Sequence, residues 1–231
     1  MYQIKKDLYT IIVSEKSDGS MNINPDGSLA NNALKLLRSL GLSNNFAYMR
    51  QTHGTDVNCI NKTGLHLCDG IVSKNNLVLG VRSADCIPLM LSANRYIGAV
   101  HVSRKNLLGG IISNLSEKLI SHGVNLSDVQ IFLGSHIRVD SYEIKSDVCE
   151  LIEKTRFSKY LLRKNKQSYF DLTAAVIGEL ARVGIRVHNV NDCMIDTYKQ
   201  SNLFSYRRDC FLSNRIETFF TIIRSNATKK N

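Results

Sequence analysis

The sequence contains no long uninterrupted apolar run. A transmembrane helix needs roughly 18–20 consecutive apolar residues, and no segment of this 231-residue chain approaches that length. The first apolar stretch, residues 9–13, is interrupted by Thr10 and is not followed by the small-residue cleavage site that export signals carry. We therefore expect a protein that neither spans a membrane nor is exported.

Metal-binding motifs with tight spacing are also missing. Neither Cys-x-x-Cys nor His-x-x-x-His occurs in the chain. Only two prolines are present, Pro25 and Pro88, and neither precedes a cysteine. The cytidine-deaminase zinc signature requires Pro-Cys-x-x-Cys, so this class of site is excluded.

Disulfide frameworks are not expected either. At 231 residues, with 43% hydrophobic and 22% charged residues, the chain resembles an ordinary globular protein that needs no staples. We expect one domain over residues 1–231. The cysteines are then reduced thiols in a cytoplasmic protein. They are Cys59, Cys68, Cys86, Cys149, Cys193 and Cys210.

Basic residues exceed acidic ones, giving a formal net charge of +10. The densest basic segment is interleaved with the aromatic residues Phe157, Tyr160 and Tyr169, a pattern compatible with RNA binding. A solvated helix and loop is the simpler explanation, and we favour that interpretation, so nucleic acid is not the expected partner. The basic residues are Lys154, Arg156, Lys159, Arg163, Lys164 and Lys166.

Hydrophobic periodicity predicts a mixture of strands and helices. Four helices are expected: one capped by Ser28 and ending at Gly41, and others over residues 107–120, 146–153 and 171–183. Because strands and helices mix without strict alternation, we expect an α/β (α+β) layered sandwich, with mixed sheets flanked by helices. Strands are expected over residues 9–14, 46–50, 57–61, 77–82, 87–91, 97–101, 129–133, 185–189 and 219–223.

Three potential metal ligands stand at predicted strand ends: His53, Cys86 and His101. Strand ends and the loops after them commonly carry reactive groups. Imidazole and thiolate are good ligands for Zn²⁺, and three protein ligands leave a fourth position open for water or substrate. A hydrogen-bonded histidine and a packed cysteine would explain the same residues, so both interpretations stay open here.

Short segments around these residues resemble a known family. Gln51-Thr52-His53-Gly54, the stretch from Gly80 to Pro88, and Gly98-Ala99-Val100-His101 are similar to the three signature blocks of the laccase-domain family. That family was named for multicopper polyphenol oxidases and is now linked to purine nucleoside phosphorylase activity. Residues 69–73, 141–144, 169–172 and 204–209 resemble further blocks in the same order.

The resemblance implies a site and an activity. His53, Cys86 and His101 would be the ligands of Zn²⁺, with Cu²⁺ as the other candidate. The substrates would be phosphate and the purine nucleosides adenosine, inosine, guanosine and methylthioadenosine, with adenosine deamination as a second activity. Arg82, Lys105 and Arg207 are candidates for holding phosphate or substrate, and Asp85 for orienting a ligand. Surface or structural cations are equal alternatives for the three basic residues, and a helix or turn cap is an equal alternative for Asp85.

The segment after His101 departs from the family pattern. Where the family usually has His-Ala-Gly-Trp-Arg-Gly, this chain has His101-Val102-Ser103-Arg104-Lys105-Asn106. Arg104 thus replaces tryptophan, and Lys105 replaces a planar bidentate arginine by a point charge. The family's paired cysteines before Tyr-Glu are replaced by Asp140-Ser141. We therefore expect a substrate range that differs from the typical member's.

Other functions compete with this interpretation. A four-copper oxidase needs many imidazoles, and this chain has six histidines with no His-x-His pair, which argues against that chemistry. A metal-free hydrolase with Cys86 as the nucleophile and a histidine as the base is an enzymatic alternative. A basic RNA-binding protein with a degenerate site is the alternative outside enzymes.

Overall fold

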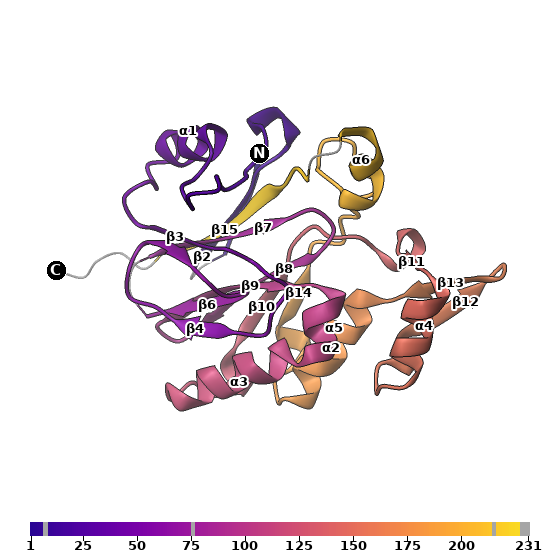
Figure 1. The fold of residues 1–231 in the computed structure, drawn as a ribbon. Coiled ribbons are helices and arrows are strands. Elements are labelled where there is room, and N and C mark those ends of the chain that lie inside the picture. The colour runs from indigo at the N-terminus through magenta and orange to yellow at the C-terminus, as the bar shows by residue number, and fades with distance from the viewer. Residues whose placement is uncertain (7–8, 75–76, 214–215, 227–231) are drawn as a thin grey trace.

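Several strands of this chain are buried along their whole length. β2 (Tyr9–Val13) and β8 (Ile87–Ala93) have no exposed residue and are mostly apolar, as expected of strands that are covered on both faces. The computed structural model, which describes residues 1–6, 9–74, 77–213 and 216–226, explains this burial (Figure 1). Two six-stranded mixed sheets pack on each other, and helices cover their outer faces.

The first sheet contains both ends of the described chain. Its central strand β15 (Phe219–Ser225) pairs antiparallel with β2 on one side and with β7 on the other, so the end of the chain completes a sheet begun at its start. β3 is parallel to both of its neighbours. The strand order is β1 (Tyr2–Lys5), β2, β15, β7 (Val78–Ser83), β3 (Phe46–Met49), β5 (Gly64–His66).

The second sheet is built around the hairpin of β8 and β9. These strands pair antiparallel from Ile87 opposite Val102 to Ala93 opposite Tyr96. β6 pairs antiparallel with β9, and β4 is parallel to β6. The strand order is β14 (Val190–Asp192), β10 (Gln130–Leu133), β8, β9 (Tyr96–Val102), β6 (Gly70–Ser73), β4 (Val57–Cys59).

Three apolar clusters fill the spaces between these layers. One lies between the sheets, where Leu79 and Val81 meet Met90 and Ala99. α1 (Asn31–Ser39) covers the outside of the first sheet with its apolar stripe. α2 (Arg104–Gly109), α3 (Ile111–Ser121), α4 (Ser146–Glu153) and α5 (Leu172–Arg182) contribute to the cluster on the outside of the second. The prediction of a layered α/β sandwich with mixed sheets flanked by helices is confirmed.

A small appendage lies beside the second sheet. It is a three-stranded sheet in the order β11 (Glu143–Ile144), β13 (Gln167–Phe170), β12 (Leu161–Lys164). α6 (Tyr206–Ser213) follows a long loop and lies near the end of β7 in Figure 1. No helix within the described ranges is long and apolar enough to span a lipid bilayer.

Two helix predictions need correction. The first helix begins at Asn31, with Ala30 as its N-cap, because Ser28 is held in a turn where its N–H and hydroxyl donate to Asp26. The helix expected over residues 107–120 is two helices. Gly110 ends α2 in a left-handed conformation, with φ of 98°, and α3 starts directly after it. Glycine adopts that conformation without the steric cost of a side chain.

Other predicted elements also differ. The strand expected over residues 185–189 is a turn of 3-10 helix, Val187–Asn189, that precedes β14. The basic segment predicted as a helix and loop ends in the hairpin of β12 and β13, whose turn places Asn165 and Lys166 at positive φ. Two of its cations are paired: Arg156 with Glu179, and Arg163 with Glu153. Sequence patterns missed β1, β5, β6, β11, β12, β13, β14 and α6.

Candidate metal centre

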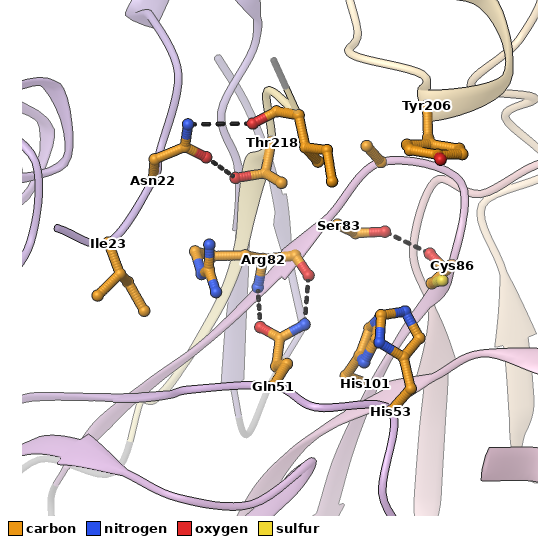
Figure 2. A pocket seen from close by; sticks show the side chains of 12 residues that line it. Asn22, Ile23, Gln51, His53, Arg82, Ser83, Cys86, His101, Tyr206 and Thr218 are labelled. Atoms are coloured by element: carbon orange, nitrogen blue, oxygen red, sulfur yellow. Dashed lines mark hydrogen bonds between the residues drawn. The ribbon is translucent and has the colours of Figure 1, made fainter. Parts of the chain in front are cut away.

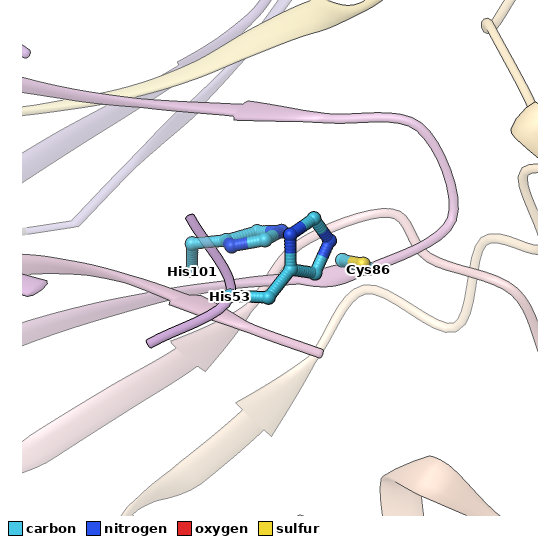
Figure 3. A group of neighbouring side chains, drawn as sticks. All are labelled: His53, Cys86 and His101. Atoms are coloured by element: carbon cyan, nitrogen blue, oxygen red, sulfur yellow. The ribbon is translucent and has the colours of Figure 1, made fainter. Parts of the chain in front are cut away.

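His53, Cys86 and His101 lie together at one end of the two packed sheets (Figure 3). His53 is in the loop from β3 to β4, and Cys86 is in the turn from β7 to β8, so both segments cross from the first sheet to the second. His101 is the second-last residue of β9, paired opposite Pro88. The potential ligand atoms of the three side chains lie within 4.8 Å of one another. The site is therefore assembled by the crossings between the sheets.

The two imidazole rings are in contact and differ in accessibility. Their centroids are 4.9 Å apart, and the ring planes are nearly perpendicular, at 80°. His101 is buried, Cys86 is half-buried and His53 is exposed. His53 also has a positive φ of 59°, which is uncommon for a residue with a side chain and often marks functional sites. The group thus faces solvent on its His53 side.

A buried carboxylate, that of Asp69, holds both histidines in place. Its Oδ1 lies 2.8 Å from His101 Nδ1 and accepts the backbone N–H of His53 at 3.1 Å. Its Oδ2 accepts the N–H groups of Thr52 and Gly54. Because Nδ1 of His101 is engaged in this way, its Nε2 is left as the atom that faces Cys86. The carboxylate behind a ligating histidine is a common feature of metal sites.

Sequence reasoning missed the role of Asp69. The residue appeared only as part of a family-like segment, although the dipeptide Asp69-Gly70 at the start of a short β-branched run marks a strand end. Asp69 precedes β6, and its carbonyl accepts the N–H of His101 across the β6–β9 pair. The closeness of Asp69 and His101 could have been inferred from the sequence only by predicting β6 and its pairing with β9.

The site is electrostatically coupled. Burial raises the pKa of the Cys86 thiol, but His101 and His53 more than offset it, so that the pKa falls to about 7. Burial lowers the pKa of His101, yet the Cys86 thiolate and the Asp69 carboxylate raise it to about 9. The protein without metal therefore favours a thiolate beside an imidazolium near neutral pH. A thiolate is the form of cysteine that binds metal or attacks an electrophile.

Asp85, the candidate for orienting a ligand, points elsewhere. Its carboxylate accepts the Thr197 hydroxyl at 2.6 Å and the backbone N–H of Arg207 at 2.7 Å. Within the described part of the chain, no hydrogen bond joins this carboxylate to His53, Cys86 or His101. Asp85 therefore acts as a cap that fixes the start of α6, the alternative that the sequence left open.

A cavity of about 590 Å³ opens onto the three potential ligands (Figure 2). This volume falls within the range of roughly 300–1,000 Å³ that is typical of small-molecule sites. Its wall mixes apolar and polar groups, with the ring of Tyr206 on α6 as its aromatic member. The lining residues other than the ligands are Asn22, Ile23, Gln51, Arg82, Ser83, Ala84, Tyr206, Ile216 and Thr218.

Arg82, predicted as a phosphate or substrate residue, lines this cavity. Gln51 fixes its backbone: the Arg82 N–H donates to Gln51 Oε1 at 3.0 Å, and Gln51 Nε2 donates to the Arg82 carbonyl at 2.8 Å (Figure 2). The Arg82 Nε is buried and has no hydrogen-bond partner among the described residues. Burial and Arg50 lower the pKa of Arg82. A buried donor without a partner is costly, so this nitrogen departs from the usual pairing of buried polar atoms.

A second, smaller cavity of about 200 Å³ lies beside the first, and the two share Ala84, Cys86 and Tyr206 as lining residues. Arg207, another predicted phosphate candidate, lines this second cavity. Lys105, the third phosphate candidate, is exposed on α2 and lines neither cavity. The preceding residue, Arg104, lines the smaller cavity.

Comparisons with known proteins identify the family of this chain and several of its relatives. The family described as multi-copper polyphenol oxidoreductase laccase matches residues 14–219. A purine nucleoside phosphorylase of Campylobacter jejuni is 30% identical over 167 residues, which cover 70% of this chain and 71% of the relative. One of Mycobacterium tuberculosis is 27% identical over 189 residues, covering 79% and 75%.

Solved structures share the fold. The hypothetical protein YfiH of Bacillus licheniformis superposes with a TM-score of 0.79 at 20% identity, covering 94% of this chain and 92% of that one. YlmD from Geobacillus stearothermophilus gives 0.77 at 17% identity, covering 95% and 92%. At these identities the likeness establishes the architecture.

Proposed function

Since this chain belongs to the family described as multi-copper polyphenol oxidoreductase laccase, we propose that it is a metal-dependent purine nucleoside phosphorylase. One observation carries the proposal: a cavity large enough for a nucleoside opens onto His53, Cys86 and His101, and the basic residue Arg82 lines its wall. The names of the relatives from Campylobacter jejuni and Mycobacterium tuberculosis support the same activity.

The three side chains suit a metal ion. Two imidazoles and a thiolate with ligand atoms within 4.8 Å are a donor set for Zn²⁺, with a position left for a substrate atom. Cu²⁺ is the alternative, because it generally binds nitrogen and sulfur ligands more tightly than Zn²⁺. The bound ion would supply Lewis-acid chemistry at the end of the cavity. Asp69 would keep the His101 ring oriented for it.

The cavity walls bind and orient the nucleoside in this proposal. Tyr206 offers an aromatic face for the purine, and Arg82 offers donors to its polar groups or to phosphate. In the reaction, a phosphate oxygen forms a bond to ribose C1′ while the bond from C1′ to the base nitrogen breaks. The electron pair of that bond stays on the purine, which takes up a proton. The products are ribose 1-phosphate and the free base.

The proposed substrates are adenosine, inosine, guanosine and methylthioadenosine. Adenosine deamination is a second reaction that the same cavity would accommodate, in which water adds at C6 and ammonia leaves to give inosine. We also propose a cytoplasmic location: all six cysteines are free thiols, as expected in a reducing compartment.

A metal-free thiol hydrolase is the second candidate, favoured by one observation. The pKa of Cys86, which burial raises and the two histidines lower, falls to about 7, so that a nucleophilic thiolate is available near neutral pH. The two candidates differ in their response to reagents. Phosphorolysis that depends on metal is lost with a chelator, whereas a thiol hydrolase survives chelation and is lost on alkylation.

The test is incubation with adenosine, with and without phosphate, followed by identification of adenine, ribose 1-phosphate and inosine. We expect adenine and ribose 1-phosphate in equal amounts only when phosphate is present. Inosine formed without phosphate would indicate deamination. The absence of all three products would overturn both activities.

A further inference from the structure

The smaller cavity, beside the proposed nucleoside cavity, is lined by two guanidinium groups. Its volume of about 200 Å³ is below the range of typical drug-sized sites, so it suits a small ion better than a nucleoside. Arg104 and Arg207 line it together with the Tyr142 ring. A concave site with two cations and one aromatic hydroxyl has the chemistry of an anion site.

Arg104 is the cation without a competing partner. No carboxylate pairs with it and no hydrogen bond engages its side chain within the described residues. Arg104 is the first residue of α2, two residues before Asn106, and the capping box formed by Ser103 and Asn106 fixes this turn. The Asn106 side chain also donates to the His101 carbonyl at 2.8 Å. This hydrogen bond connects the first turn of α2, which carries Arg104, to the backbone of the potential metal ligand.

Arg207 is positioned by three contacts. Its backbone N–H is held by Asp85 at 2.7 Å, its Nη2 donates to the Glu143 carbonyl at 2.8 Å, and its guanidinium lies 5.7 Å from the Tyr142 ring centre. The remaining donors of this guanidinium are free to bind an anion. Asp85 also lines the cavity, but Thr197, Arg207 and Ser205 already satisfy its carboxylate by hydrogen bonds.

The Tyr142 ring, with its hydroxyl, lines the same cavity as both cations, and the Arg207 guanidinium lies over it. With no hydrogen bond to this hydroxyl among the described residues, it remains able to donate to an anion. The two guanidinium groups share this lining with the Asp85 carboxylate, which is already hydrogen-bonded, and with the Cys86 thiolate, whose charge a bound metal ion would offset.

We propose that this small cavity is a subsite for a phosphate group, held by Arg104 and Arg207. The inference rests on the proposed phosphorolysis and deepens it by assigning each cavity a substrate. Because the two cavities share Cys86, Ala84 and Tyr206, a phosphate in the smaller one would approach the nucleoside beside the potential metal ligands. Arg104 stands where the family usually has tryptophan, so this cation is a departure of this chain from its family.

Calorimetric titration of the full-length, metal-replete protein with inorganic phosphate tests the proposal directly. Four proteins are compared: the wild type, Arg104→Gln, Lys105→Gln and Arg95→Gln. Arg95 is exposed in the turn at the far end of the β8–β9 hairpin, so its variant matches the charge change away from the site. We expect the Arg104 variant to bind phosphate roughly tenfold more weakly or worse, with adenosine binding preserved. The other two variants should stay close to the wild type.

A second arm, titration with adenosine and with adenosine 5′-monophosphate, separates free phosphate from phosphate carried on a nucleotide. Tighter binding of the monophosphate that depends on Arg104, without binding of inorganic phosphate, would keep the subsite but overturn phosphorolysis. Phosphate binding that depends on Arg104, without formation of ribose 1-phosphate, would likewise keep the subsite and overturn phosphorolysis. Two results would overturn the subsite. One is a phosphate affinity that Arg104→Gln leaves unchanged. The other is no binding of inorganic phosphate together with no gain in affinity of adenosine 5′-monophosphate over adenosine.

Discussion

Asp69 and His101 are joined by a contact of 2.8 Å between Oδ1 and Nδ1, and both side chains are almost completely buried. The same carboxylate receives the backbone N–H groups of the loop that carries His53. Burial raises the pKa of Asp69, but His101 and the backbone donors outweigh it and leave the pKa below its ordinary value. One charged group therefore positions two of the three potential ligands.

Asp69→Asn should weaken metal binding. An amide has one acceptor oxygen where the carboxylate has two, so it cannot satisfy the imidazole and the three N–H groups together. Loss of such a partner usually costs about 10–100-fold in metal affinity or activity. The measurement is the dissociation constant for Zn²⁺ by competition with a chelator. Asp128→Asn, at an exposed position, is the matched control, and equal affinity in both variants would refute the role of Asp69.

Arg82→Gln should raise the KM for adenosine by tenfold or more, because a positively charged side chain in the wall of the larger cavity is removed. The phosphate affinity of the smaller cavity should change much less. Steady-state kinetics with each substrate varied in turn separates the two effects, and Arg95→Gln serves as the control. An unchanged KM for adenosine would remove Arg82 from the nucleoside cavity.

Acid should destabilise the protein through His136, which is completely buried. Its Nδ1 lies 2.6 Å from the Gly134 carbonyl, so this nitrogen carries the proton, and Nε2 accepts from the Thr173 hydroxyl and from Arg138. Burial, together with the charge of Arg138, lowers its pKa to about 4. The unfolded chain then takes up a proton near the ordinary value of 6.5, before the folded chain does.

The stability that a neutral His136 provides is therefore complete above pH 6.5 and is lost as the pH falls toward 4. One proton contributes at most about 1.4 kcal/mol per pH unit to this slope. Urea unfolding at pH 7 and pH 5 measures it. His136→Gln should be less stable at pH 7 but lose less stability between these values. An identical loss in both proteins would refute the assignment.

Some of this architecture could be predicted from the sequence. Strands such as β2 and β8 are long buried apolar runs, and α4 and α5 have clear helical periodicity, so local patterns are sufficient to find them. Short strands such as β5 and β11 have two or three residues and exist only because a neighbour pairs with them. The turn of Asn165 and Lys166 has no glycine to signal its positive φ.

The candidate site shows the same division. His53, Cys86 and His101 were recognised from residue type, strand ends and family resemblance, and they do lie together. The contacts of Asp69 and the position of Arg104 at the smaller cavity were not, because they depend on the β6–β9 pairing and on the direction of the first turn of α2. The motif predicts Lys105 as a phosphate residue, whereas Arg104 lines the smaller cavity, because a sequence motif gives the order of residues but not the face of a helix.

The metal content of the purified protein tests the central claim most directly, compared among the wild type, Cys86→Ser and Cys59→Ser. Cys59 is an exposed free thiol in β4, outside the candidate site, so its variant controls for the loss of one cysteine. With His53, Cys86 and His101 as ligands, elemental analysis should find close to one metal ion per chain in the wild type and in Cys59→Ser. Cys86→Ser should retain almost none. Full occupancy in Cys86→Ser would contradict the assignment of Cys86 as a ligand and, with it, the proposed metal centre.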